Sequence, residues 1–209
     1  MNVDVDTQIS AVTRKLGDRP GEDGELLEMT ISQAYDTDAA DLWDCVTNGE
    51  RIARWFMPVS GDLRLGGKYQ LEGNAGGTVD RCDPPRSFNA TWEFGGGVSW
   101  IEVVITAEDD GRSRFTLVHT AKVDEQLWDV YGPGAVGVGW DGMVLGLGLY
   151  LGSGEANDPA EAEAWSGTDE GRRFTRLSSD AWVEAAIAYG RDPEKARAAG
   201  EKTVEFYTP

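Results

Sequence analysis

The single histidine of the chain, His119, is the side chain best suited to acid or base chemistry near neutral pH. One histidine excludes a multi-histidine metal site, and no serine occupies the sequence setting of a nucleophile elbow, so a Ser-His-Asp triad is not indicated. Catalysis would depend on His119 alone or on an inward-facing strand glutamate such as Glu72, Glu93 or Glu102. Because His119 ends an alternating apolar segment, we interpret it as a hydrogen-bonded residue of the core or of a cavity rim, and we predict no catalytic residue.

Two glycine-rich segments resemble phosphate-binding motifs in composition only. The segment Gly137-Val138-Gly139-Trp140-Asp141-Gly142 has the spacing GxGxxG, but it follows the loop Gly132-Pro133-Gly134 and not a strand of a βαβ unit. The segment Gly95-Gly96-Gly97 lacks the Lys and Ser/Thr of a phosphate loop and is typical of a hairpin turn. We therefore reject dinucleotide binding and expect no cofactor.

The two cysteines, Cys45 and Cys82, stand far apart, and neither belongs to a CxxC pair. This pattern disfavours a zinc ribbon and thioredoxin-like chemistry, so we expect two reduced thiols and no metal site. Residues 1–24 contain no secretory signal pattern, and no segment approaches 18 uninterrupted apolar residues. We expect a cytoplasmic protein.

The charge of the chain limits its partners. Acidic residues number 37 against 19 basic ones, which gives a net charge of -18. An anionic surface of this size repels nucleic-acid phosphates and anionic headgroups, so we predict neither a nucleic acid nor a membrane as partner. The length of 209 residues and the 40% of apolar residues are typical of one well-filled core.

The hydrophobic periodicity changes along the chain. Residues 9–16 and 26–35 are predicted to be extended, with the turn-rich segment 17–24 between them, and two short helices are expected between Thr37 and Phe56. From Leu63 to Thr120 the period is two, which predicts an antiparallel meander that is apolar on one face. A helix from about 139 to 152 must cover that face, and two more helices are expected after residue 171.

The expected long helix carries Gly142, Gly146 and Gly148, each of which costs about 1 kcal/mol relative to Ala in a helix interior. Close packing on the sheet and room for a ligand both explain them. Aromatic residues of the strands and helices could line such a space, although core packing is the alternative for each one. The candidate cavity residues are Trp55, Phe56, Tyr69, Trp92, Phe94, Trp100, His119, Trp140, Met143 and Leu147.

Three ordered signatures lie at Asp41-Leu42-Trp43 through Glu50 to Pro58; at Gly66-Gly67-Lys68-Tyr69 with Gly77-Thr78-Val79 and Asp83-Pro84-Pro85-Arg86; and at Thr91-Trp92-Glu93 with Phe115 to Thr120. Together they resemble the START-like superfamily known as SRPBCC, and specifically its bacterial branch similar to the activator of the heat-shock-protein-ninety ATPase (AHSA-type). The resemblance implies an α+β helix-grip fold, in which a curved antiparallel sheet wraps around the long helix and leaves a cavity for a ligand.

The resemblance also leads to expectations about the domain boundaries and the function. We expect an N-terminal extension at 1–24, a START-like domain at 25–152, and an acidic linker with a helical extension at 153–209. The first hypothesis is a protein that binds an apolar or aromatic small molecule. The alternatives are a chaperone-associated stress-response interaction protein and a cyclase- or hydrolase-like enzyme using the same cavity. The sequence leaves open whether the protein forms a homodimer.

Overall fold

The computed structural model describes residues 3–21 and 24–208, which form an α+β fold with one eight-stranded sheet. The strand order is β1-β2-β8-β7-β6-β5-β4-β3. The strands are β1 (Thr13–Gly21), β2 (Gly24–Tyr35), β3 (Val59–Gly61), β4 (Lys68–Leu71), β5 (Gly76–Asp83), β6 (Ser87–Phe94), β7 (Gly97–Ala107) and β8 (Ser113–Ala121). The helices are α1 (Val5–Ala11), α2 (Ala39–Thr47), α3 (Gly49–Trp55), α4 (Glu125–Tyr131), α5 (Gly134–Ser153), α6 (Pro159–Ser166), α7 (Asp169–Ala188) and α8 (Pro193–Tyr207).

The chain divides into two compact units, each built from separate segments. Unit 1 comprises Met1–Ile31, Lys122–Leu145 and Asp158–Pro209. Unit 2 comprises Ser32–Ala121 and Gly146–Asn157. The division falls inside β2 and inside α5, so each of these two elements contributes residues to both units.

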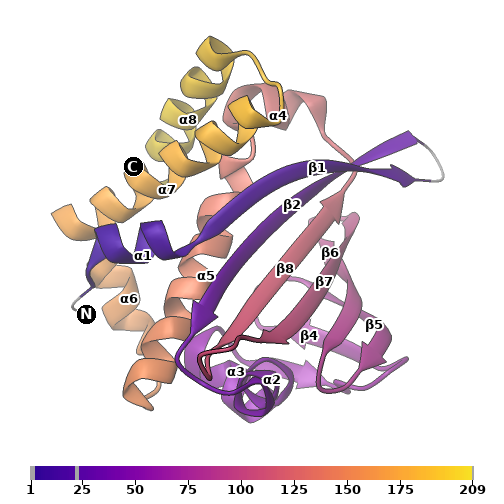
Figure 1. Ribbon diagram of the computed structural model, residues 1–209. Helices are drawn as coiled ribbons and strands as arrows, with labels where there is room; N and C mark the ends of the chain where they lie inside the picture. Colours follow the sequence, from indigo (N-terminus) through magenta and orange to yellow (C-terminus); the bar gives the residue numbers. More distant parts are fainter. Residues whose placement is uncertain (1–2, 22–23, 209) are drawn as a thin grey trace. The chain divides into compact units, whose positions relative to one another are not determined.

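Unit 2 contains the antiparallel meander from β3 to β8, whose strands lie side by side in Figure 1 with α2 and α3 at one end. Asp38 caps α2 by accepting hydrogen bonds from the N–H groups of Ala40 and Asp41, and Asn48 both ends α2 and caps α3. The ring of Trp43 in α2 meets that of Phe88 in β6 edge-on at 6.3 Å. Helix α2 therefore packs on the sheet through this aromatic contact.

One face of this sheet is covered by the second half of α5. The hydroxyls of Ser32 in β2 and Thr116 in β8 lie 3.0 Å apart, which places both on the same face. Since successive side chains alternate, Gln33 and Tyr35 lie on the other face. A Cβ added at Gly148 of α5 would lie 3.4 Å from the ring of Tyr35, so α5 packs closely there. We call this covered side the helix face and the opposite side the outer face.

The strand register extends these two faces across the meander. Leu117 of β8 is opposite Val103 of β7, and Val103 is opposite Phe88 of β6, so all three lie on the helix face. By the same alternation, the helix face of β4–β8 also includes Tyr69, Gly77, Val79, Cys82, Ala90, Trp92, Phe94, Ser99, Ile101, Ile105, Phe115 and His119. Most of its aliphatic members are buried, which is the apolar face that the sequence predicted.

Unit 1 is mainly helical and is held by a buried ion pair. Arg14 of β1 donates to both carboxylate oxygens of Asp141 in α5, the shortest contact being 2.6 Å, and the two side chains are only 5% and 1% exposed. Ser178 and Trp182 of α7 donate to the same carboxylate at 2.6 and 2.9 Å.

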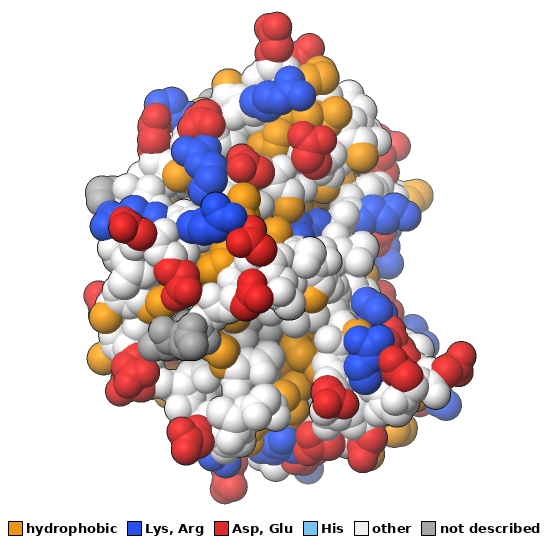
Figure 2. All heavy atoms as spheres, turned by 60° about the vertical axis from the view of Figure 1, so that its left-hand side comes forward, with side chains coloured by type: hydrophobic (Ala, Val, Ile, Leu, Met, Phe, Trp, Pro, Cys, Tyr) orange, Lys and Arg blue, Asp and Glu red, His pale blue; other side chains and the backbone are white. Residues whose placement is uncertain are grey.

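On the face seen in Figure 2, acidic and basic side chains are interspersed.

The predicted α+β helix-grip fold is confirmed, with its two short helices after β2, its meander and its long helix. The long helix begins at Gly134 and not near 139, so the GxGxxG segment lies inside a helix. Part of the first predicted extended segment is wrong, because Val5–Ala11 forms α1 behind an Asp4 cap. Helices α4 and α6 were not predicted, and residues 22–23 of the predicted turn lie outside the described residues.

In the described residues, α5 is the one helix with the length and composition of a membrane-crossing segment. Its 18-residue window has a mean hydropathy of 1.3 and is 56% buried within the protein. Asp141 in its first half and Tyr150 in its second half are both engaged by arginines, at 2.6 Å to Arg14 and 3.3 Å to Arg51. The helix therefore packs as a core helix.

Candidate functional site

The candidate site lies on the helix face of unit 2, where Trp92, Ser99 and His119 come together. The rings of Trp92 in β6 and His119 in β8 have centroids 6.4 Å apart. Between them in the sheet lies Ser99 of β7, whose Oγ is 2.8 Å from Nε2 of His119 and donates to the carbonyl oxygen of Trp92 at 3.1 Å. Three adjacent antiparallel strands thus each supply one member of the cluster.

Burial determines the charge of His119. Its Nε2 lies 2.8 Å from Ser99 Oγ, and the tautomer of the ring decides which of the two atoms donates the hydrogen bond. His119 is 7% exposed, and this burial lowers the pKa of the imidazole from 6.5 to about 4. The ring is therefore neutral at physiological pH and acts as a polar group without charge.

Two further aromatic residues lie on the same face as Trp92. Tyr69 of β4 is opposite Gly77, and its hydroxyl donates to the carbonyl oxygen of Thr91 at 2.6 Å. Burial, with a smaller effect of nearby carboxylates, raises the pKa of Tyr69 to about 12, so the phenol stays protonated. Phe94 ends β6 two residues after Trp92 and is 61% exposed. The helix face is thus aromatic and partly accessible at this end of the sheet.

Trp100 does not share this surface, which corrects its place among the expected cavity residues. It follows Ser99 directly and is opposite Thr120, so alternation places it on the outer face. Its side chain is 41% exposed there. Aromatic character alone had grouped it with Trp92, although the two residues lie on opposite sides of the sheet.

Trp55 and Phe56 pack away from the cluster, at the end of α3. Nε1 of Trp55 donates to the carbonyl oxygen of Cys45 at 3.0 Å, and the ring stacks on Phe56 at 5.6 Å. A Cβ added at Gly146 would lie 2.7 Å from the carbonyl oxygen of Trp55, so the backbones of α5 and α3 are in close approach. This contact favours close packing over ligand room as the reason for Gly146.

The three candidates from α5 are all buried. Leu147, in unit 2, is 0% exposed and belongs to the packed core. Trp140 and Met143 are 7% and 5% exposed and belong to unit 1. Within unit 2, the expected residues that gather on the accessible end of the helix face are therefore Tyr69, Trp92, Phe94 and His119.

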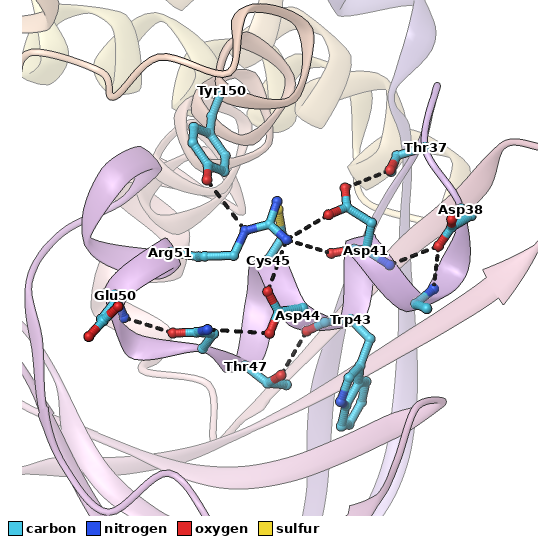
Figure 3. Close-up of polar contacts among 12 residues, drawn as sticks. Thr37, Asp38, Asp41, Trp43, Asp44, Cys45, Thr47, Glu50, Arg51 and Tyr150 are labelled. Carbon is cyan, nitrogen blue, oxygen red and sulfur yellow. Dashed lines mark hydrogen bonds and ion pairs between the residues drawn. The ribbon is translucent and has the colours of Figure 1, made fainter.

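A second polar cluster in unit 2 joins α2, α3 and α5 (Figure 3). NH1 of Arg51 lies 2.6 Å from a carboxylate oxygen of Asp41 and 3.0 Å from one of Asp44, and its Nε donates to the hydroxyl of Tyr150 at 3.3 Å. Hydrogen bonds from Arg51 lower the pKa of the Asp41 carboxyl. Cys45, beside them, has its pKa raised to about 11 by burial, which makes it a poor nucleophile. We interpret this cluster as a structural clamp.

The chemistry that the Trp92–Ser99–His119 cluster supports is recognition more than proton transfer. A base with a pKa near 4 accepts protons poorly at neutral pH, although its contact with Ser99 has the length of a catalytic Ser–His pair. Among the described residues, no three His, Cys, Asp or Glu side chains gather as ligands of a metal would. Sequence reasoning missed Ser99, and strand alternation from Trp92 across the hairpin turn was the signal that could have found it.

Comparison with known proteins gives one family. Residues 36–152 match the family described as "Activator of Hsp90 ATPase homolog 1-like protein". No curated protein matches the chain. A crystal structure of CalU16 from Micromonospora echinospora is 30% identical, with a TM-score of 0.68, and the match covers 85% of this chain and 99% of that one.

Two further structures extend this comparison. A solution structure of the same CalU16 is 31% identical, with a TM-score of 0.69, and the match covers 86% and 96% of the two chains. DynU16, described as a protein in the dynemicin biosynthetic locus, is 18% identical with a TM-score of 0.53, and the match covers 62% of this chain and 48% of that one. The last likeness shows the fold alone.

Proposed function

Since the chain belongs to the Activator of Hsp90 ATPase homolog 1-like family and has a fold of the ligand-binding type, we propose that it binds an apolar or aromatic small molecule on the helix face. The observation that carries the proposal is the accessible aromatic surface of Trp92 and Phe94 beside the hydrogen-bonded pair of Ser99 and His119. Flat aromatic side chains next to a few fixed polar groups are the usual lining of small-molecule sites.

A screen with a matched pair of variants tests this function. Neutral aromatic metabolites and lipids are screened by thermal shift, and hits are verified by native mass spectrometry of the intact chain. Trp92→Ala should weaken binding of a hit by about tenfold or more, as is usual for a central aromatic contact. Trp100→Ala removes a neighbouring tryptophan from the outer face and should leave the affinity unchanged. Equal effects of the two substitutions, or no hit at all, would contradict the proposal.

A chaperone-associated role is the second candidate, and the family description favours it because it names an activator of the Hsp90 ATPase. The test is the ATPase rate of the Hsp90-type chaperone from the same organism, with and without this protein. A rate increase that saturates with protein concentration supports the role, and an unchanged rate at low and high salt excludes it.

An enzyme that uses the same face is the third candidate, and the contact of 2.8 Å between Ser99 Oγ and His119 Nε2 is the observation in its favour. Once a ligand is identified, its turnover is followed by mass spectrometry with the wild type and with His119→Gln. Loss of turnover with retained binding supports an acid–base role, whereas an unaltered ligand in both samples leaves binding as the function.

A further inference from the structure

We propose that the ligand of the helix face is electrically neutral and that anionic and cationic analogues are rejected. This inference rests on the proposed function and specifies the chemical class of its ligand. The structural basis is a separation of charge between the two faces of the sheet in unit 2.

Seven charged residues lie on strands β3–β8. Alternation in the paired register places six of them on the outer face, namely Lys68, Arg81, Asp83, Glu93, Glu102 and Arg114. The seventh, Asp80, lies at the register shift between Val79 and Arg81 and is exposed. A ligand on the helix face therefore meets none of these six ionised side chains.

The β2 and α5 segments of unit 2 add no charge to this face, and the α2 carboxylates Asp41 and Asp44, on the helix whose Trp43 contacts Phe88, are both paired with Arg51. The β2 residues on the helix face are Gln33 and Tyr35, and both lie next to Gly148 of α5. The part of α5 in unit 2, residues 146–153, has the sequence GLGLYLGS, which contains no ionisable group except the Tyr150 phenol. That phenol accepts a hydrogen bond from Arg51 in the structural clamp.

The polar groups of the face offer hydrogen bonds but no counter-charge. The Tyr69 phenol is protonated, and the His119 imidazole is neutral and already bonded to Ser99. A charged ligand that leaves water for this surface would lose its hydration without gaining an ion partner, and such a transfer is strongly unfavourable. A neutral aromatic ligand loses little hydration and gains the apolar contact.

The overall negative charge of the protein has a different effect on ligands from local desolvation on the helix face. The chain carries a net charge of -18, and Glu93 and Asp80 lie near enough to Tyr69 to raise its pKa after burial. These carboxylates repel anions and attract cations, whereas loss of hydration on the helix face disfavours ions of either sign. Rejection of both anionic and cationic ligands therefore distinguishes local desolvation from the overall field. High salt separates the two further, because the Debye length falls to about 3 Å near 1 M.

The experiment uses the intact chain and a matched set of probes. The fluorescent neutral reporter N-phenyl-naphthylamine is displaced by naphthalenemethanol, naphthoate or naphthylmethylammonium, which share one ring system and differ in charge. In about 1 M NaCl, the neutral alcohol should compete at least about tenfold better than either ion. If naphthoate or the ammonium competes as well as the alcohol, the inference is overturned.

Two variants with the same change in net charge localise the effect. Ser99→Lys puts a cation on the helix face, and Trp100→Lys puts one on the outer face at the next position. Ser99→Lys should raise the affinity for naphthoate by about tenfold relative to Trp100→Lys. Equal naphthoate affinities in the two variants would contradict the inference, provided that circular dichroism shows both to be folded.

The proposed function and this inference fail in different ways. If the reporter binds wild type and Trp92→Ala equally weakly, the helix face is not a binding surface and the proposed function fails. If reporter binding depends on Trp92 but the three competitors are equivalent, the face binds ligands and only the inferred neutrality is wrong.

Discussion

Arg14 and Asp141 are 127 positions apart in the chain and form a bidentate ion pair from which water is almost wholly excluded. Ser178 and Trp182 complete the hydrogen bonding of the carboxylate, so one side chain of α5 is tied to β1 and α7 within unit 1. Two desolvated charges are tolerated here because every carboxylate oxygen has donors.

Replacing Asp141 by Asn should destabilise the protein by about 3 to 5 kcal/mol, because Arg14 would keep its charge without a counter-ion. Urea unfolding followed by circular dichroism measures the loss. The exposed pair of Asp6 and Arg173, at 2.6 Å, supplies the control, and Asp6→Asn should cost under about 1 kcal/mol. The double variant Arg14→Met, Asp141→Leu should recover much of the loss, and similar costs for the two single variants would contradict this role.

Two glycines of the GxGxxG segment should respond oppositely to alanine. A Cβ at Gly137 would lie 2.4 Å from the Trp182 ring, so Gly137→Ala should destabilise the protein by about 1 to 3 kcal/mol through overpacking. At Gly142, on the same helix, nothing lies within 4 Å, and Gly142→Ala should stabilise by up to about 1 kcal/mol through helix propensity. The melting temperatures of the two variants test this prediction, and a lower melting temperature for both would contradict it.

Acidification should destabilise the protein through His119. The folded state holds the imidazole pKa near 4, below its ordinary value of 6.5, so the unfolded state binds the proton more readily. This contribution to the free energy of unfolding is complete above pH 6.5 and is lost as the pH falls toward 4, by about 3 kcal/mol in total. Carboxylates titrate in the same range, so His119→Gln is measured beside the wild type. The stability advantage of the wild type should shrink with falling pH, and parallel curves would count against it.

The two thiols should differ in reactivity. Cys45 is 0% exposed and burial raises its pKa to about 11, whereas Cys82 is partly exposed. Iodoacetamide at mildly alkaline pH should alkylate Cys82 in the native protein and reach Cys45 only in urea, as read by peptide mass spectrometry. Cys82→Ser should then show no native alkylation, and rapid labelling of Cys45 in the folded protein would refute its burial.

Periodicity predicted the elements that are long or regular. The period of two from Leu63 to Thr120 gave the meander, and the apolar stripe at Trp140, Met143, Val144 and Leu147 gave the core helix. Helices α1, α4 and α6 have 7, 7 and 8 residues, too few turns for a stripe to emerge. Their caps were the usable signal, since Asp4, Asp124 and Asp158 each accept hydrogen bonds from the first turn.

The candidate site was predicted only in part, because its geometry depends on register. Trp92 and His119 were named as candidates, but their partner Ser99 is set by the β6–β7 hairpin, in which Phe94 is opposite Gly97. The same hairpin sends Trp100 to the outer face. Composition cannot separate Ser99 from Trp100, because one position along a strand reverses the face. No sequence pattern around Arg14 or Asp141 predicts that the two residues form an ion pair.

The division of the chain into interleaved units has a consequence for synthesis on the ribosome. The segment of unit 1 that ends at Ile31 is translated before its partners at 122–145 and 158–209. Arg14 therefore has no counter-ion until Asp141 is translated, and the Asp141 carboxylate lacks its other two donors until Ser178 and Trp182 follow. The segment Ser32–Ala121 is translated in one stretch, so the meander can begin to pair while the unit that starts the chain is still incomplete.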